Sequence, residues 1–164
     1  MAQSRARVER LMLPTEANFT GNVFGGALLA EVDRAAYIAA RRHSGTSCVT
    51  ASIDRVDFLA PVHVGEVVEF DARLTWVGVT SMEVWVQFRS EPIDGGPQRL
   101  VGNAFVTMVG VDAEGRPVRV PSLALRSASD RRAYAAGARR MASRRRARAG
   151  RREKPTRAAR EGGR

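Results

Sequence analysis

The chain has 164 residues, the size of one ordinary domain, and 44% of them are hydrophobic, which is enough to form a buried core. Its net charge of +10 comes entirely from residues 126–164, which hold 15 Arg or Lys and 3 Asp or Glu. One cysteine, Cys48, excludes an internal disulfide and a cysteine metal cluster, and no uncharged apolar run approaches the ~20 residues of a membrane span.

The N-terminal segment MAQSRARVERLML does not resemble a secretory signal, because charged residues interrupt its short apolar stretch. Together with the single cysteine, this favours a soluble, cytoplasmic protein. The charge distribution predicts three parts: a globular domain over residues 1–125, a basic helix over 126–148 and a disordered Arg-rich tail over 149–164. The function is expected to reside in the globular domain, whose charge is nearly balanced.

In chain order, a short strand over residues 8–13 precedes one long helix over residues 25–43. Small and apolar side chains recur along this helix at helical spacing and form a broad face, which comprises Leu28, Leu29, Val32, Ala35, Ala36, Ala39 and Ala40. Glu31 and Arg34 are placed on the opposite, polar face, and Asp33 on the flank between the two faces. The alanines would let the helix lie close to a sheet.

Four strands follow the helix, over residues 47–58, 66–78, 80–90 and 99–112, with Gly- or Pro-containing turns between them. Side chains alternate along the second and third of these strands, so that Trp76 is expected to face inward and Glu83 outward. One-sided alternation is typical of an antiparallel sheet. The sequence therefore predicts an α+β fold, an antiparallel sheet wrapped around a central long helix, with a further helix that begins at Ser129 as its N-cap.

Residues 18–33, NFTGNVFGGALLAEVD, carry the polar groups that could do chemistry. Gly25 and Gly26 at the helix entrance leave backbone N–H groups uncovered, so a carbonyl oxygen lodged there would be polarised as in an oxyanion hole. Asp33 could act as a general base or nucleophile, and Asn18 could orient a water or an acyl group. The glycines lack the spacing and the Lys-Ser/Thr of nucleotide-phosphate loops, which excludes that class of site.

Three motifs over about residues 10–121, N-x-x-G…F-G-G…D, F-x-x-P-V-x-x-G and G-x-T-S-M, together resemble those of the hotdog-fold acyl-CoA thioesterases. The similarity is to the acyl-CoA hydrolase branch, which contains bacterial YciA-like and cytosolic long-chain enzymes. It implies a hotdog fold, hydrolysis of acyl-CoA to fatty acid and coenzyme A, and no metal or cofactor apart from the coenzyme A of the substrate. It also implies a homodimer, or a trimer of dimers.

Carried over residue by residue, the resemblance assigns Asn18 and Asp33 as the catalytic pair, supplied by opposite subunits across a two-fold interface. It places the backbone amides of Gly25 and Gly26 at the thioester carbonyl, and the coenzyme A arm near residues 49–52 and 80–82. The candidate substrate contacts are Phe24, Thr50, Ser81 and Met82.

The chain departs from the pattern of this family at a position that could bind the coenzyme A phosphates. Some relatives carry a basic residue in the F-x-x-P loop, where this chain has Leu59 and Ala60. Arg55 and Arg73 are the alternative phosphate anchors. Dehydration chemistry is disfavoured, because hotdog hydratases place a histidine five residues after the aspartate and this chain has Ile38 there.

The Arg-rich C-terminal part supports a second hypothesis of a different class: a non-catalytic hotdog sensor that binds acyl-CoA and contacts nucleic acid through its basic tail. Nucleic-acid binding is not expected, because Tyr134 is the only aromatic residue among the arginines and no helix-turn-helix domain is present. A truncation after Ser127 would distinguish the two hypotheses.

Overall fold

The computed structural model describes residues 4–152, with side chains described up to residue 147. The secondary-structure elements in chain order are β1 (Arg5–Leu11), the 3-10 turn η1 (Pro14–Glu16), α1 (Gly25–Ser44), β2 (Ser47–Phe58), β3 (Glu66–Val77), β4 (Ser81–Pro92), β5 (Arg99–Val111) and α2 (Ala128–Arg152). Of the expected disordered tail, residues 153–164 lie outside the described residues, and residues 149–152 continue α2.

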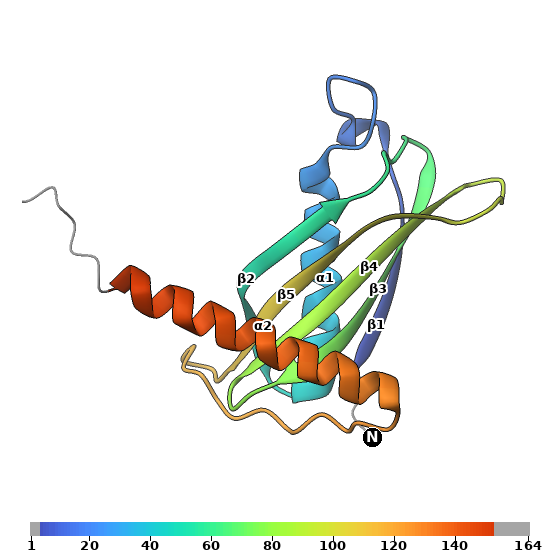
Figure 1. Cartoon of the computed structure of the whole chain (residues 1–164). Coiled ribbons are helices and arrows are strands. Elements are labelled where there is room, and N and C mark those ends of the chain that lie inside the picture. The colour runs from blue at the N-terminus through green and yellow to red at the C-terminus, as the bar shows by residue number, and fades with distance from the viewer. Residues whose placement is uncertain (1–3, 153–164) are drawn as a thin grey trace, which may run out of the picture.

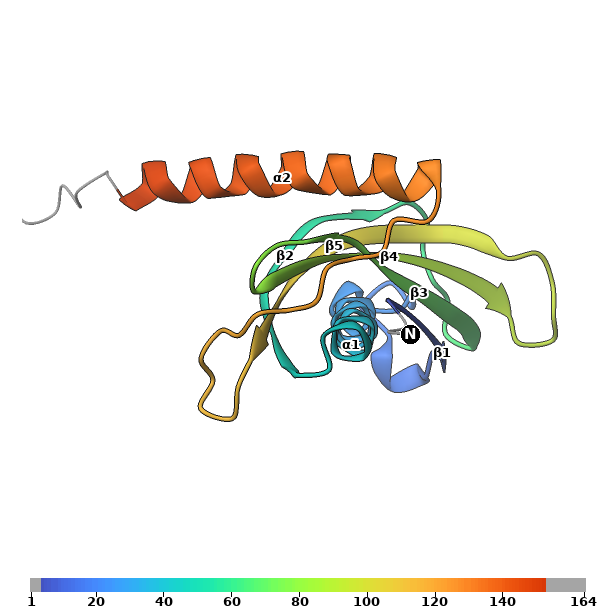
Figure 2. The ribbon, with the colours of Figure 1, turned by 90° about the horizontal axis from the view of Figure 1, so that it is seen from below.

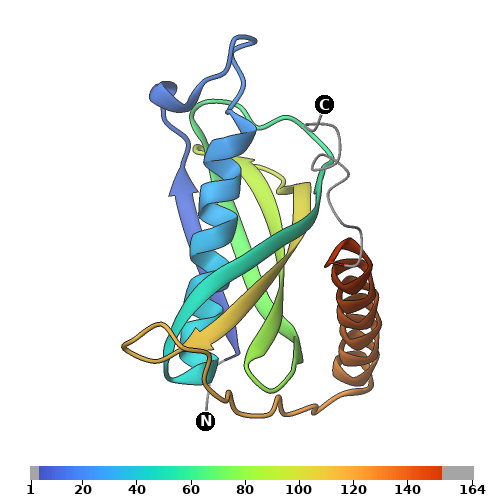
Figure 3. The ribbon, with the colours of Figure 1, turned by 90° about the vertical axis from the view of Figure 1, so that its left-hand side faces the viewer.

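The five strands form one antiparallel sheet in the order β1-β3-β4-β5-β2. The sheet curves around α1, and α2 lies across its other face (Figures 1, 2 and 3). The predicted fold, an antiparallel sheet wrapped around a central helix with a further C-terminal helix, is confirmed. No described helix is long and apolar enough to cross a membrane.

The core lies between α1 and the concave face of the sheet. Ala35, Ala36, Ala39 and Ala40 are completely buried, as are Phe70 and Phe88 of the facing strands. Because alanine side chains are small, the helix backbone can approach the sheet closely. The helix ends at Gly45, which has a φ of 72° and donates its N–H to the carbonyl of Arg41, a left-handed cap that glycine adopts without strain.

Two side chains of the predicted pattern point elsewhere. Glu31 is 2% exposed rather than on a polar face, because it faces β1 and pairs with Arg10 there and with Arg34. Trp76 does not face inward, because β3 holds an extra residue: Leu74 pairs with Val84, whereas Trp76 pairs with Glu83. This bulge reverses the alternation, and Trp76 lies against α2 instead of α1.

The N-terminus of α2 is capped by Ser127 rather than by Ser129. The Ser127 hydroxyl accepts the N–H of Asp130 at 3.0 Å, and the Asp130 carboxylate accepts the N–H groups of Ser127 at 2.9 Å and Arg126 at 3.1 Å. This reciprocal arrangement is a capping box. The sequence-based choice of Ser129 was wrong by two residues, because Ser127 and not Ser129 lies three residues before Asp130, the spacing that a capping box requires.

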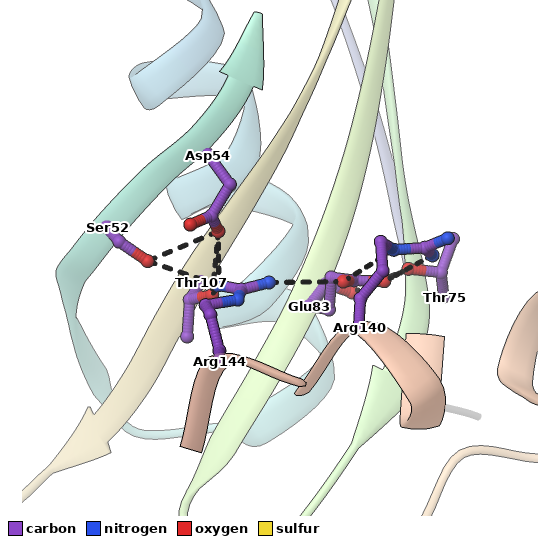
Figure 4. A network of polar contacts seen from close by, with 7 residues as sticks. All are labelled: Ser52, Asp54, Thr75, Glu83, Thr107, Arg140 and Arg144. Carbon is purple, nitrogen blue, oxygen red and sulfur yellow. Dashed lines mark hydrogen bonds and ion pairs between the residues drawn. The ribbon is translucent and has the colours of Figure 1, made fainter. Parts of the chain in front are cut away.

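A buried carboxylate attaches α2 to the sheet. Glu83 faces away from α1 as predicted, yet it is 0% exposed because α2 covers it. It accepts hydrogen bonds from Arg140 at 2.7 and 3.0 Å, from Arg144 at 3.3 Å and from Thr75 at 2.7 Å (Figure 4). A side chain at Gly137 would come within 2.8 Å of the Glu83 carboxylate, so glycine is required for this close approach.

Arg144 extends the same network to β2. Its guanidinium pairs with Asp54 and contacts Thr107, and it donates to the Ser52 hydroxyl at 3.1 Å (Figure 4). The arginines of α2 therefore bridge three strands through polar groups, since β4, β2 and β5 each supply a partner.

Candidate active site

Asn18 lies in the loop before α1, where its side chain organises a tight turn. The Asn18 Oδ1 atom accepts hydrogen bonds from the N–H of Thr20 at 2.9 Å, the N–H of Asn22 at 3.1 Å and the Thr20 hydroxyl at 2.7 Å. Among the described residues, the Asn18 Nδ2 atom has no acceptor. The turn thus fixes the amide by its oxygen and leaves its N–H groups available to a ligand.

A second loop, residues 59–66, supports the Asn18 loop. The His63 ring lies 2.9 Å from the side-chain oxygen of Asn22, and the N–H of Val23 donates to the carbonyl of Val62 at 2.8 Å. Glu66 holds this second loop in turn, because it accepts from Arg99 at 2.6 and 2.7 Å and from the N–H of His63 at 3.1 Å.

Glu66 should make stability depend on pH in the acid range. Partial burial alone would raise the pKa of Glu66, but the Arg99 guanidinium and the N–H of His63 outweigh it and lower the pKa below 4.5. A carboxyl group with a lowered pKa in the folded state contributes stability above its unfolded pKa, and this contribution is lost as pH falls through the folded value. As the pH is lowered below about 4.5, the free energy of unfolding should therefore decrease less steeply in Glu66→Gln than in the parent.

Urea unfolding between pH 7 and pH 3 would measure this difference. Glu91→Gln, which removes a carboxylate of β4 without such partners, is the matched control and should keep the parental slope. Equal slopes for the parent and Glu66→Gln would contradict the prediction.

The entrance of α1 presents two uncovered amides. The N-cap residue Phe24 offers no side-chain cap, and neither Gly25 nor Gly26 donates its N–H to an acceptor among the described residues. The Phe24 ring lies directly over Gly26, where an added Cβ atom would meet it at 2.2 Å, and the Phe58 ring lies 3.4 Å from the corresponding point on Gly25. The Phe24 ring can thus pack this closely only because residue 26 is glycine, whereas a Cβ atom at residue 25 would make an ordinary contact with Phe58.

Asp33 lies on the flank of α1 that faces β2 and is half-buried. The Thr50 hydroxyl of β2 donates to the Asp33 Oδ1 atom at 2.6 Å. Among the described residues, the second carboxylate oxygen of Asp33 has no partner. One oxygen is therefore fixed by the protein, and the other is free to accept a proton from a water molecule.

The remaining candidates lie apart from this carboxylate. Met82 is completely buried and pairs with Met108, whose sulfur lies 3.5 Å from the Thr50 hydroxyl. Ser81 lines a small cavity on the α2 side of the sheet, together with Arg144. The structure thus brings Thr50 to Asp33 and does not bring Ser81 or Met82 to it within one chain.

Asn18 and Asp33 make no contact with each other in the described chain. Asp33 lies eight residues after Gly25, which corresponds to about 12 Å along the helix axis. Asn18 lies in the loop before Gly25, at the end of the helix away from Asp33. Each has its own local partners. A single chain therefore does not assemble this pair.

The surface around Asp33 is apolar and includes a free strand edge. β2 is the last strand of the sheet, so its outer edge has no partner among the described residues. Several large apolar side chains of β2, of α1 and of the loop before α1 are exposed, namely Phe19, Phe24, Tyr37, Val49, Ile53 and Phe58. The described residues contain no group of three or more His, Cys, Asp or Glu side chains that could hold a metal ion.

The chain is similar to known proteins over this region. The thioesterase superfamily profile matches residues 20–96. An acyl-CoA thioester hydrolase of Bacillus subtilis is 40% identical over 110 residues, 67% of this chain and 64% of that protein. One from Zymomonas mobilis is 35% identical over 114 residues, 69% of this chain and 76% of that protein. The chain thus spans slightly less than two thirds of the B. subtilis relative.

Solved structures agree over nearly the whole chain. Acyl-CoA hydrolase from Bacillus cereus has a TM-score of 0.84 and 36% identity, covering 92% of both chains. A hexameric acyl-CoA thioesterase has a TM-score of 0.81 and 39% identity, covering 88% of this chain and 94% of its own. Acyl-CoA hydrolase from Staphylococcus aureus, solved with butyryl coenzyme A and coenzyme A, has a TM-score of 0.83 and 32% identity, covering 93% of both.

The S. aureus structures include alanine variants of an asparagine, an aspartate and a threonine. The spacing of these three positions along that chain equals the spacing of Asn18, Asp33 and Thr50 here. The motifs, the sheet wrapped around α1 and the relatives agree, and the chain belongs to the thioesterase superfamily, in its branch of hotdog-fold acyl-CoA hydrolases.

Proposed function

We propose that this protein hydrolyses acyl-CoA thioesters to a free fatty acid and coenzyme A. The observation that carries the proposal is the Asp33 carboxylate, one oxygen of which is fixed by Thr50 at 2.6 Å while the other is open. Uncovered amides at Gly25 and Gly26 lie at the start of the same helix. The names of the relatives and the coenzyme A bound in the S. aureus structure support this substrate class.

In the proposed mechanism, Asp33 takes a proton from a water molecule as the water oxygen attacks the thioester carbonyl. The negative charge that develops on the carbonyl oxygen is stabilised by the N–H groups of Gly25 and Gly26 of the partner subunit and by the positive end of that helix dipole, because the corresponding glycines of the same chain lie about 12 Å from Asp33 along the helix axis. The C–S bond then breaks, coenzyme A leaves as a thiolate, and the proton held by Asp33 returns to the sulfur. Direct attack by Asp33, through an anhydride, would give the same products. Neither route requires a metal or a further cofactor.

The complete site requires two copies of the chain in this proposal, because Asn18 and Asp33 do not meet within one. A second copy pairing along the free edge of β2 would cover the exposed apolar side chains and bring Asn18 of the partner subunit toward Asp33. The hexameric relative supports a homo-oligomer, and a trimer of dimers would satisfy the same contacts. Phe24 would then contact the acyl chain, and Thr50 would hold Asp33 rather than the coenzyme A arm.

Mixing two inactive variants tests this arrangement. Asn18→Ala and Asp33→Ala should each be inactive, but a dimer of one copy of each contains one site with both native residues. After co-expression with two affinity tags, random pairing should restore about a quarter of parental activity. If the two residues worked within one chain, every site would lack one of them and the mixture would stay inactive.

The control combines Asn18→Ala with the double variant Asn18→Ala/Asp33→Ala. No dimer of this mixture contains Asn18, so it should show no recovery. Isolation of the doubly tagged species would prove that mixed dimers had formed. Inactive mixed dimers would contradict the two-subunit site, and full activity of either single variant would contradict the proposed function.

A further inference from the structure

A second cavity lies on the opposite side of the sheet from Asp33. It has a volume of about 570 Å³ and is enclosed by the start of α2, the segment that leads to it, and neighbouring ends of β1 and β3. These strands form the edge of the sheet that is farthest from β2 in the strand order. The cavity is therefore separate from the proposed thioester site.

The cavity collects positive charge. Three arginines line it, Arg5, Arg73 and Arg126, and Asp130 is the one acidic residue among the described residues that line it. The Asp130 carboxylate already accepts the backbone N–H groups that cap α2. Arg5 and Arg73 alone outnumber this carboxylate, so the cavity retains a positive charge.

Arg5 and Arg73 stand directly opposite each other across the β1–β3 ladder. Like charges at such positions destabilise a sheet unless an anion lies between them. The Arg73 guanidinium is held over the Trp85 ring at 4.6 Å, and its Nε atom is buried without a hydrogen-bond partner among the described residues. A buried donor of this kind is costly to leave unpaired, so the arrangement is prepared for an acceptor.

We propose that this cavity binds a phosphate-bearing organic anion of about the size of a mononucleotide. A phosphate dianion matches the excess charge better than a carboxylate does, and guanidinium groups fit phosphate oxygens in pairs. A phosphate ion alone would leave most of the cavity empty. The organic part would lie against the apolar side chains of Leu123 and Ala133, which also line it. Binding in this cavity requires neither Asp33 nor hydrolysis of a thioester.

Calorimetric titration of the full chain with adenosine 5′-monophosphate tests the proposal, with adenosine 3′,5′-bisphosphate and inorganic phosphate as parallel ligands. Arg73→Gln should weaken mononucleotide binding by about 10-fold or more, because it removes a charged hydrogen-bond donor. Arg5→Gln, an exposed position, should weaken it in the same direction. Tighter binding of the bisphosphate would identify the nucleotide end of coenzyme A as the ligand, and equal binding a free mononucleotide; both outcomes support the site.

Arg131→Gln is the matched control. It removes one positive charge from the first turns of α2 without lining the cavity, so mononucleotide affinity should stay within about 2-fold of the parent. The proposal is overturned if the parent binds no nucleotide, if Arg73→Gln and Arg5→Gln both bind as the parent does, or if Arg131→Gln loses as much affinity as Arg73→Gln. If inorganic phosphate bound as tightly as the nucleotides, the ligand would not need an organic part, and that element of the proposal would be overturned. Binding is measured without substrate, so failure here leaves the hydrolysis proposal untouched.

Discussion

Replacing Asp33 by asparagine is expected to lower kcat for acyl-CoA hydrolysis by about 10²–10⁴-fold, with a much smaller change in KM. Asparagine has nearly the same shape and its carbonyl oxygen can still accept the Thr50 hydroxyl, so the fold and the binding surface should survive. Unlike the Asp33 carboxylate, the asparagine amide cannot take a proton from water. Steady-state hydrolysis of a series of acyl-CoA chain lengths, followed by the release of free thiol, measures the loss.

The matched control for this variant is Asp57→Asn. Asp57 is a partly exposed carboxylate of β2 that pairs with Arg55 at 2.9 Å, and it has no contact with Asp33 or Thr50. Its replacement should leave kcat within about 3-fold of the parent. If Asp33→Asn retained parental kcat with every acyl-CoA that the parent cleaves, Asp33 would be neither base nor nucleophile.

The largest effect on stability is expected at the junction between α2 and the sheet. Replacing both Arg140 and Arg144 by methionine should reduce the free energy of unfolding by about 3–5 kcal/mol, because Glu83 would remain buried without a positive partner. Removing the negative charge instead, by Glu83→Gln, should reduce the free energy of unfolding by less. The side chains of Arg140 and Arg144 are 35% and 22% exposed and can turn toward water, whereas Glu83 is 0% exposed and cannot.

A triple variant separates loss of the ion pairs from loss of packing. Adding Glu83→Met to the two arginine changes removes the isolated charge, and most of the lost stability should return, since apolar groups often replace buried ion pairs without loss. Urea unfolding of the parent, the double and the triple variants gives the comparison. If the double variant were as stable as the parent, Glu83 would not depend on α2.

The same junction decides where the C-terminal part can be cut. A truncation after Ser127 would remove α2 entirely and uncover Glu83 and Trp76, so lost binding or activity could reflect misfolding. A truncation after Arg152 removes only residues beyond the described helix and leaves every partner of Glu83 in place. The second truncation is therefore the one that tests whether the basic tail contributes to binding.

Much of the fold could be predicted because most elements carry their own periodicity. The helix expected over residues 25–43 forms as Gly25–Ser44, and the four strands expected after it all form. Period-two alternation cannot reveal whether a later element covers the outer face of a strand, and for that reason the burial of Glu83 was not predicted. Glu31 was assigned to the polar face because its partner Arg10 lies on a separate strand.

The candidate site was only partly predictable. Asn18, Asp33 and the two glycines occur in one short motif, so they could be selected together. Thr50 was selected for a different role, because its contact with Asp33 depends on how β2 passes the flank of α1. A register shift of β2 against β5 lies between Thr50 and Ser52, so that Thr50 reaches Asp33 while Ser52 reaches Arg144 on the other side. Alternation alone does not locate such a shift.

The extra residue in β3 allows one strand to serve two hydrophobic layers. Up to Leu74 the strand supplies its large side chains to the layer beneath α1, and after Thr75 it supplies Trp76 to the layer beneath α2. If Thr75 took part in strict alternation, the indole of Trp76 would point into a layer built around completely buried alanines, where it has no space. The position of the extra residue therefore decides which of the two layers receives Trp76.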